Sequence, residues 1–431
     1  MQTDIERYFD ACVHSIAKIV KIDSSQCPAL PGKPFGEGAA RALGCFLALA
    51  ESFGFETHNY DNYIGEVVFG SGEPFAILCH LDVVPAGSGW THDPFGGEIA
   101  DGKIYGRGTT DDKGPAVICL YCLKALKDAG FAPKRTIKLI VGCNEESGWA
   151  CIEHYNACAE MPKEGFSPDA DFPVIYAEKG ILHIRLDYPL ENAPFAALEG
   201  GERENMVCDY ARADVAAFDA ARAAKYGVTA EGASVVAHGR SAHASTPDAG
   251  ENALEKLLRY FAEEHGGVAR AVADLFDDRL GLKQLRDETG ALTLSPDVAS
   301  YKEGTLSVLT DVRYPATMRR EQILAKLEAF GVPYAVLHDQ APLLSDQNGS
   351  LVSTLLRIYR EETGQKADPI AIGGGTYARA LERGAAFGPE FPGEPSTIHQ
   401  KDEFISLENV RKLLRIYCAA IRALTEEGTD R

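Results

Sequence analysis

The sequence predicts an α/β fold in which a domain with a mostly parallel sheet, flanked by helices, is interrupted by an inserted α+β domain. Up to about residue 180, short apolar runs alternate with amphipathic segments, which is the rhythm of a parallel sheet with covering helices. The pattern changes near residue 180 and returns near residue 345. We therefore expect one domain to consist of residues 1–179 and 346–431, and the inserted domain to consist of residues 180–345.

Buried strands and helices alternate in the first part of the chain. Residues 75–79 and 137–141 are wholly apolar, which is typical of strands buried on both faces of a sheet. Between them, Gly114 and Pro115 open an apolar segment, and proline is favoured in the first turn of a helix. The expected elements here are helices over residues 1–20, 37–53 and 115–129 and strands over residues 75–79, 137–141 and 173–176.

The middle of the chain mixes helical and strand-like segments without the earlier regular alternation. This mixture predicts an α+β insertion, and the α/β character returns in the last part of the chain. The expected elements are strands over residues 234–238 and 305–312, helices over residues 213–226, 251–264 and 319–330, and, after the insertion, helices over residues 351–362 and 407–424.

Composition narrows the class of protein. The 431 residues include 63 acidic and 43 basic side chains, a formal net charge of −20, which argues against nucleic acid or an anionic membrane as a partner. No signal-peptide pattern opens the chain, and no apolar run of about 18 residues occurs. The 11 cysteines are an odd number and are scattered through apolar segments, so we expect reduced thiols and a cytoplasmic location. Cys119 and Cys122 fall on the apolar face of an expected helix, where we expect core packing.

The first candidate motif is His80-Leu81-Asp82, which directly follows the expected strand 75–79. In open α/β sheets, ligands bind outside the carboxyl ends of the strands. The imidazole of His80 can bind a cation there, and Asp82 can hold the other ring nitrogen. Taken alone, this motif fits a structural histidine equally well.

The second and third motifs supply carboxylates. The segment GRGTTDDKGP at residues 106–115 lacks the phosphate-binding pattern GxxxxGK[ST], and its paired Asp111 and Asp112 would repel phosphate and attract cations. In NEESG, one of Glu145 and Glu146 can bind a metal while its neighbour takes a proton from metal-bound water. A turn or helix cap for the aspartates and a solvated turn for the glutamates are the alternatives.

Two weaker elements complete a set of metal ligands. They are Asp169 in SPDA and His399 in TIHQKDE. With the earlier motifs they offer two imidazoles and three carboxylates, a mixed set that Zn²⁺ and Mn²⁺ both accept. Five ligands with one shared carboxylate fit two ions about 3.5–4 Å apart, the usual spacing in two-metal hydrolases.

In their order, the motifs HLDVVP, GRGTTDDKGP, EESGW, PDA and TIH resemble those of the dinuclear metallopeptidases of aminoacylase and carboxypeptidase type. Among these, the chain is most similar to the bacterial PepV-type Xaa-dipeptidases, and the likeness extends from roughly residue 70 to residue 405. The resemblance implies two divalent ions per chain (Zn or Mn, with Co possible) and a dipeptide as the small-molecule substrate. It also implies a catalytic domain with an inserted lid domain.

The resemblance assigns a role to each ligand. It implies that Asp111 bridges the two ions, that His80 and Asp169 complete one of them, and that Glu146 and His399 complete the other. In relatives, the peptide bond between the two positions that match Asp111 and Asp112 is cis, so we expect the same here.

Two further residues carry the chemistry that the resemblance implies. Glu145 would be the general base for attack by a metal-bridging hydroxide, and Asp82 would orient His80.

The insertion resembles the lid of these enzymes. By that likeness, His243 in GRSAHAS would stabilise the oxyanion, and Asn205 and Arg313 would grip the terminal carboxylate of the substrate. A guanidinium suits that task because its planar fork can donate two hydrogen bonds. A surface histidine and an exposed strand charge are the alternatives. The large size of the lid resembles that of relatives that need no partner, so we expect a monomer.

A glycine run near the end of the chain offers one more substrate-binding segment. Gly373, Gly374, Gly375 and Thr376 precede an expected helix, whose first backbone N–H groups can hold an anion. A plain tight turn is the alternative.

Three rival functions are open at this point. An amidohydrolase that removes an acyl group from an amino acid would share the whole metal site. A metal-binding protein without turnover would have no use for Glu145 beside Glu146. Nucleotide binding through the glycines at 106 and 108 is disfavoured by the neighbouring carboxylates.

Overall fold

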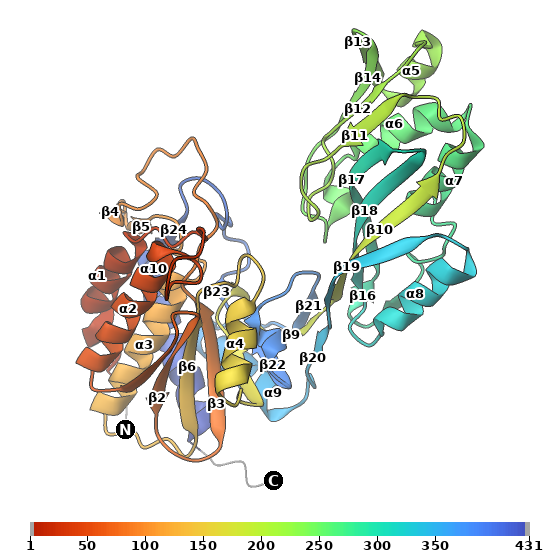
Figure 1. Ribbon diagram of the computed structural model, residues 1–431. Helices are drawn as coiled ribbons and strands as arrows, with labels where there is room; N and C mark the ends of the chain where they lie inside the picture. The colour runs from red at the N-terminus through yellow and green to blue at the C-terminus, as the bar shows by residue number, and fades with distance from the viewer. Residues whose placement is uncertain (1–3, 427–431) are drawn as a thin grey trace. The chain divides into compact units, whose positions relative to one another are not determined.

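The computed structural model describes residues 4–426 and divides the chain into two compact units (Figure 1). The first unit takes in the chain up to Tyr176, then Leu344–Ile370, and then the chain from Gly375 onward. The second unit consists of Ala177–Leu343 and Ala371–Gly374. The short piece Ala371–Gly374 has no counterpart in the predicted boundaries, and it separates Gly373 and Gly374 from Gly375.

The first unit is built on a sheet whose central strands are parallel. The parallel neighbours follow the order β6, β3, β7 and β22, and antiparallel strands continue the sheet on both sides. β3 is buried along its whole length after its first residue, which explains its wholly apolar sequence. The bounds are β1 (Glu56–Tyr60), β2 (Ile64–Phe69), β6 (Thr136–Gly142), β3 (Pro74–His80), β7 (Glu164–Ser167), β22 (Arg383–Ala386), β9 (Ile175–Glu178) and β20 (Leu343–Leu344).

Helices cover this sheet. α3 packs against both α1 and α10, and its side chains are buried almost throughout, including Cys119 and Cys122 as predicted. α2 and α4 pack against β1 and β2. The bounds are α1 (Phe9–Val20), α2 (Glu37–Ser52), α3 (Lys113–Asp128), α4 (Ala150–Cys158), α9 (Ser350–Thr363) and α10 (Leu407–Thr425).

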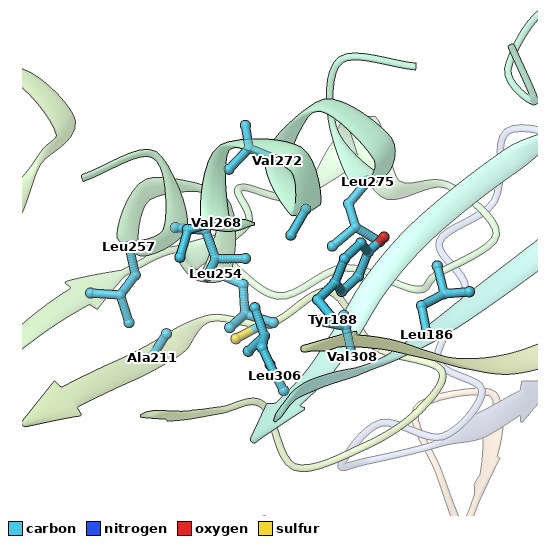
Figure 2. Close-up of a cluster of buried hydrophobic side chains, with 14 of the residues drawn as sticks. Leu186, Tyr188, Ala211, Leu254, Leu257, Val268, Val272, Leu275, Leu306 and Val308 are labelled. Carbon is cyan, nitrogen blue, oxygen red and sulfur yellow. The ribbon is translucent and has the colours of Figure 1, made fainter. Parts of the chain in front are cut away.

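The second unit is an antiparallel sheet with helices packed on one face. Along β10 (Gly180–Pro189), Leu182 and Ile184 face a hydrophobic core, while His183 and Arg185 point to the opposite face, because side chains alternate along a strand. Figure 2 shows side chains from the helices and strands meeting in this core. The strand order is β13 (Val228–Glu231), β14 (Ser234–His238), β12 (Tyr210–Asp214), β11 (Ala197–Gly200), β17 (Thr293–Lys302), β18 (Thr305–Tyr314), β10 and β19 (Tyr334–Gln340). The helices are α5 (Ala220–Tyr226), α6 (Ala253–Ala262), α7 (Gly266–Leu275) and α8 (Arg320–Ala329).

The predicted fold class is confirmed, but some elements differ from the prediction. The expected helix over residues 213–226 is wrong in its first half. The segment Tyr210–Asp214 is strand β12, which pairs with β14, and α5 begins only where the Asp219 carboxylate caps the N–H groups of Ala221 and Arg222. The expected helix after the glycine run is a single 3₁₀ turn at Tyr377–Ala380.

Two further observations concern the whole chain. In the range 4–426, no helix is long and apolar enough to cross a membrane. All eleven cysteines are free, and most of them are buried.

Candidate metal centre and active site

The ends of three parallel strands bring the predicted ligands to one edge of the sheet. β3 ends at His80, β6 leads into the segment with Glu145 and Glu146, and β7 leads to Asp169. Since these strands are parallel neighbours, their carboxyl ends meet, as ligand-binding sites of α/β sheets require. Asp111 precedes α3.

Asp111 lies between the two histidines. Its Oδ1 is 2.8 Å from Nε2 of His80, and its Oδ2 is 2.9 Å from Nε2 of His399. On one side, Oδ2 of Asp169 is 3.5 Å from Nε2 of His80, and on the other, Oε1 of Glu146 is 3.0 Å from Nε2 of His399. The structure therefore brings together all five side chains that the sequence nominated as ligands.

The donor atoms fit divalent cations. Nε2 of His80 and Oδ1 of Asp111 are buried and only 2.8 Å apart, yet neither has a hydrogen-bond partner. A cation between them would satisfy both atoms. Two triads have atoms within 4.8 Å of one another, and each mixes nitrogen with oxygen as Zn²⁺ and Mn²⁺ accept. The triads are His80, Asp111 and Glu146, and His80, Glu145 and Asp169.

The pKa values show how strongly the centre attracts positive charge. Burial lowers the pKa of His399, but its contacts with Asp111 and Glu146 outweigh burial and raise it to about 11. Burial, reinforced by Asp111, raises the pKa of Glu146 to about 7 and that of Asp169 to about 6. A proton on His399 thus occupies the place that a metal ion would take, and ion binding has to displace it.

Asp82 lies behind the proposed ligands, and its contacts with His80 differ in part from the predicted ones. Nδ1 of His80 lies 3.0 Å from the backbone oxygen of Asp82 and 3.4 Å from its carboxylate. The two carboxylate oxygens accept the backbone N–H groups of Glu145 and Glu146, at 3.0 and 3.1 Å. Asp82 therefore fixes the glutamate pair as well as the imidazole.

Glu145 lies beside the ligands and has a donor of its own. Nε1 of Trp149 donates a hydrogen bond of 3.3 Å to Oε1 of Glu145. Burial raises the pKa of Glu145 well above its usual range; the charge of His80 opposes this, while the carboxylates of Asp169 and Glu146 add to it. A carboxylate that holds a proton readily suits general base chemistry.

Sequence reasoning gave no role to several buried groups beside the ligands. Oδ2 of Asp112 accepts the backbone N–H of His80 at 3.0 Å, and the peptide bond between Asp111 and Asp112 is cis, as predicted. Nζ of Lys113 donates to the backbone oxygen of Ile22 at 2.7 Å, and burial lowers its pKa to about 8. The run Asp111-Asp112-Lys113 could have indicated these contacts. Three adjacent charged residues that lead into an apolar helix become buried, and buried charges need partners.

The predicted lid residues lie in the second unit. His243 is exposed, and its Nδ1 is 2.7 Å from Oγ of Ser245. Asn205 is exposed, and its backbone oxygen accepts the N–H of Ala244 at 2.9 Å. The loop that contains His243 therefore lies beside the loop that contains Asn205, and an isolated bridge between Met206 and His243 joins the same two loops.

Arg313, by contrast, is buried and held by three bonds. Its Nε and Nη2 donate to the two carboxylate oxygens of Asp311, both at 2.7 Å, and its Nη1 donates to the backbone oxygen of Gly373 at 3.1 Å. His183 is also buried here, with Nε2 3.3 Å from Oδ2 of Asp311. In the first unit, Oγ1 of Thr376 caps the 3₁₀ turn by accepting the N–H of Ala378.

Comparison with known proteins agrees with this geometry. Residues 76–423 match the model of peptidase family M20/M25/M40. The chain belongs to this family. The Bacillus subtilis (strain 168) protein YtjP, provisionally named a dipeptidase, is 37% identical over 460 residues that cover 99% of both chains. The Beta-Ala-Xaa dipeptidase of Lactobacillus delbrueckii subsp. lactis is 33% identical over 455 residues, or 97% of each chain.

Solved structures share the fold of this M20 protein. Human carnosine dipeptidase 1 matches with a TM-score of 0.60 and 14% identity over 98% of both chains. The di-peptidase Dug1p of Saccharomyces cerevisiae matches with a TM-score of 0.60 and 13% identity over 98% of this chain and 97% of its own. The protein is a peptide hydrolase of a metal-dependent family.

Proposed function

We propose that this M20 protein is an Xaa-dipeptidase that works with two divalent metal ions. The observation that supports the proposal is the position of Asp111, whose two carboxylate oxygens each lie within 3 Å of a different histidine. In the proposal, His80 and Asp169 hold one ion, His399 and Glu146 hold the other, and Asp111 serves both. Zn or Mn fits this donor set, with Co as a third candidate.

Bound ions would supply Lewis acidity, which polarises the peptide carbonyl and makes water a better nucleophile near neutral pH. The protein's own step is proton transfer. Glu145 accepts a proton from the attacking water and returns it to the leaving amine, while Trp149 holds the carboxylate by its hydrogen bond. Asp82 keeps the segment with Glu145 in place through its two backbone contacts.

The second unit would bind the substrate. Arg313 and Asn205 are proposed to hold its terminal carboxylate, and His243 to stabilise the oxyanion of the tetrahedral intermediate. The contacts of Arg313 with Asp311 and Gly373 support this, because they fix the guanidinium, and its remaining N–H groups would lose little freedom on binding a carboxylate. Gly373, Gly374, Gly375 and Thr376 are proposed as a further contact for the substrate through their backbone.

The test is hydrolysis of simple dipeptides and of the same dipeptides with an acetylated amine, by protein stripped of metal and reloaded with Mn²⁺ or Zn²⁺. We expect cleavage of the free-amine forms only. Cleavage of the acetylated forms instead would identify an N-acyl-amino-acid amidohydrolase with the same metal centre. Cleavage of neither would favour a metal-binding protein without turnover.

Two coarser features accompany the proposal. The eleven free cysteines support a reducing compartment such as the cytoplasm. The large second unit, with a core of its own, supports a monomer. Light scattering that gave a mass near 46.5 kDa would agree with a monomer, and twice that mass would contradict it.

A further inference from the structure

A buried glutamate in the loop after His399 has no part in the proposed chemistry. Glu403 is only 1% exposed and lies between His399 and strand β24 (Phe404–Ser406). A carboxylate that is buried this deeply needs charged or hydrogen-bonding partners, since desolvation is costly. The partners of Glu403 all belong to one other segment of the chain, the segment that contains Asp111.

Both oxygens of Glu403 are engaged there. Oε2 accepts a hydrogen bond of 2.6 Å from Nη1 of Arg107. Oε1 accepts the backbone N–H groups of Gly108 and Thr110, both at 3.0 Å, and that of Asp111 at 3.4 Å. One side chain thus accepts three backbone N–H groups of a turn that ends in a proposed metal ligand.

Backbone contacts continue the same junction. The N–H of Gly106 donates to the backbone oxygen of Glu403 at 2.9 Å, and Oγ1 of Thr110 donates to the backbone oxygen of Phe404 at 3.0 Å. Next to these contacts, β24 pairs with β5 (Lys103–Tyr105). Several hydrogen bonds therefore join the loop with His399 to the loop with Asp111, although the two loops are far apart in sequence.

Arg107 is itself held in place. It is 2% exposed, its backbone N–H donates to Pro94 at 2.9 Å, and its guanidinium lies 5.2 Å from the ring centre of Trp90. The pair of Arg107 and Glu403 is thus a rigid anchor rather than a flexible surface ion pair.

We propose that Glu403 is a positioning residue of the metal centre. It fixes the Asp111 loop against the His399 loop, so that the carboxylate of Asp111 reaches both histidines at once. The inference rests on the proposed two-ion assignment. Loss of Glu403 should mainly weaken the ion proposed to be held by His399 and Glu146, because Glu403 and His399 share one loop. His80 is instead held in position by strand β3.

The first unit contains a matched control. Arg135 and Glu164 form another buried ion pair, with Nη1 of Arg135 2.8 Å from Oε1 of Glu164 and with exposures of 2% and 7%. Glu164 is the first residue of β7, so it lies at the end of the sheet opposite to the ligands. Loss of this pair removes a buried charge contact of the same kind without touching either ligand loop.

The experiment compares Glu403→Gln with Glu164→Gln in the full-length protein. Both variants are titrated with Zn²⁺ and with Mn²⁺ by calorimetry, and their metal content is measured after dialysis. We expect Glu403→Gln to bind the second ion about 10–100-fold more weakly and to retain close to one ion per chain, as loss of outer-shell partners does elsewhere. Glu164→Gln is expected to bind two ions like the wild type, even if its melting temperature falls equally.

Wild-type binding of both ions by Glu403→Gln would overturn the inference, and so would equal loss of ions in both variants. If Glu403→Gln does not fold, Glu403→Asp takes its place, since it keeps the charge but cannot reach Arg107 and the backbone donors together. Wild-type affinity of that variant would also overturn the inference.

The outcome is separable from the proposed function. A wild type that binds two ions and cleaves no peptide would contradict the dipeptidase proposal and leave the role of Glu403 intact. A wild type that binds only one ion would overturn the role of Glu403.

Discussion

At the scale of single residues, Glu145 is the group at which a substitution best distinguishes metal binding from catalysis. It touches Trp149 through its carboxylate and Asp82 through its backbone, and its neighbour Glu146 makes the contact with His399. We therefore expect a change to the Glu145 carboxylate to alter the proposed proton transfer while leaving the proposed ligands in place.

We expect Glu145→Gln to lower kcat by about 10²–10⁴-fold, the usual contribution of a general base. The amide keeps the shape of the side chain and can still accept the hydrogen bond from Trp149, so the metal content should equal that of the wild type. Steady-state kinetics and metal analysis on the same preparation check both statements. Glu153→Gln, at an exposed position of α4, is the control. A variant that kept most of its activity would show that another group is the base.

The pKa values of the centre lead to a prediction about protons. The metal-free centre holds a proton on His399, whose pKa is about 11, and Glu146 and Asp169 still bind protons near pH 7 and 6. Each ion must displace such protons, so metal affinity should rise as pH rises from 6 to 8, and protons should be released. Calorimetry in buffers of different ionisation enthalpy counts the protons. An affinity that does not depend on pH would contradict the prediction.

The side chains that we propose as ligands could be nominated from the sequence because each lies at a recognisable strand end or in a recognisable motif. Glu403 and Trp149 could not be predicted in this way, because their roles depend on contacts with residues that only the folded chain brings near. For Trp149 the partner is four residues away, but the direction of its indole depends on the turn that precedes α4. For Glu403 the partners are almost 300 residues away, and no periodic pattern signals such a contact.

At the scale of elements, strands β10, β17 and β18 of the second unit carry a row of polar residues on the face opposite to the core. Asp311 and Arg313 lie on β18, His183 lies opposite Asp311 on β10, and Ser295 lies opposite Asp311 on β17. This row holds the guanidinium proposed to bind the substrate carboxylate.

We expect Arg313→Lys to raise KM for dipeptides by about 10–100-fold with a smaller change in kcat. An ammonium cannot make both bonds to Asp311, and a charge-assisted hydrogen bond is worth roughly 1.5–3 kcal/mol. Arg185→Lys is the control, because Arg185 contacts Asp187 with the same two-residue spacing but is exposed. The KM for dipeptide amides, which lack the carboxylate, should not rise in this way. If it rises as much as the KM for dipeptides, the proposed role of Arg313 is wrong.

A buried carboxyl group on β17 leads to a prediction about stability. Asp297 is fully buried, and burial raises its pKa to about 9, with Asp311 adding to the effect and the hydroxyl of Ser295 opposing it. The unfolded chain loses this proton near pH 4, so between about pH 4 and 9 unfolding releases a proton and stability falls as pH rises.

We expect Asp297→Asn to remove this fall in stability with rising pH, which amounts to at most about 1.4 kcal/mol per pH unit. The free energy of unfolding of the variant, relative to that of the wild type, should therefore increase between pH 6 and pH 9. Urea unfolding of the full chain at the two pH values measures the difference. A difference that stays constant would contradict the raised pKa.

The elements that the sequence predicted well are those with one clear period. The helices over residues 251–264 and 407–424 and the apolar strands of the first unit match α6, α10, β3 and β6 closely. The expected helix over residues 213–226 began too early because the many alanines of this segment favour a helix. Its first residue, Ala213, instead belongs to β12, where it points into the core two residues after Ala211. Tertiary pairing with β14 outweighed the local preference of these residues.

At the scale of the whole molecule, the first unit is discontinuous in sequence and the second unit is inserted. The predicted boundaries had the chain leave the first domain once and return to it once. In the structure the chain enters the second unit again, at Ala371–Gly374. Sequence could not reveal this short return, because three successive glycines carry no periodicity and are compatible with a simple turn.

This second entry limits how the protein can be divided by genetic engineering. A gene fragment that encodes only Ala177–Leu343 would lack the carbonyl of Gly373, the third acceptor of the Arg313 guanidinium. The remaining fragment would in turn carry four residues whose partners had been removed. Swapping lids between related enzymes therefore requires two separate exchanges, one of the long insertion and one of the short Ala371–Gly374 piece. A chimera made with the first exchange alone would carry the arginine that we propose to bind substrate without its third acceptor.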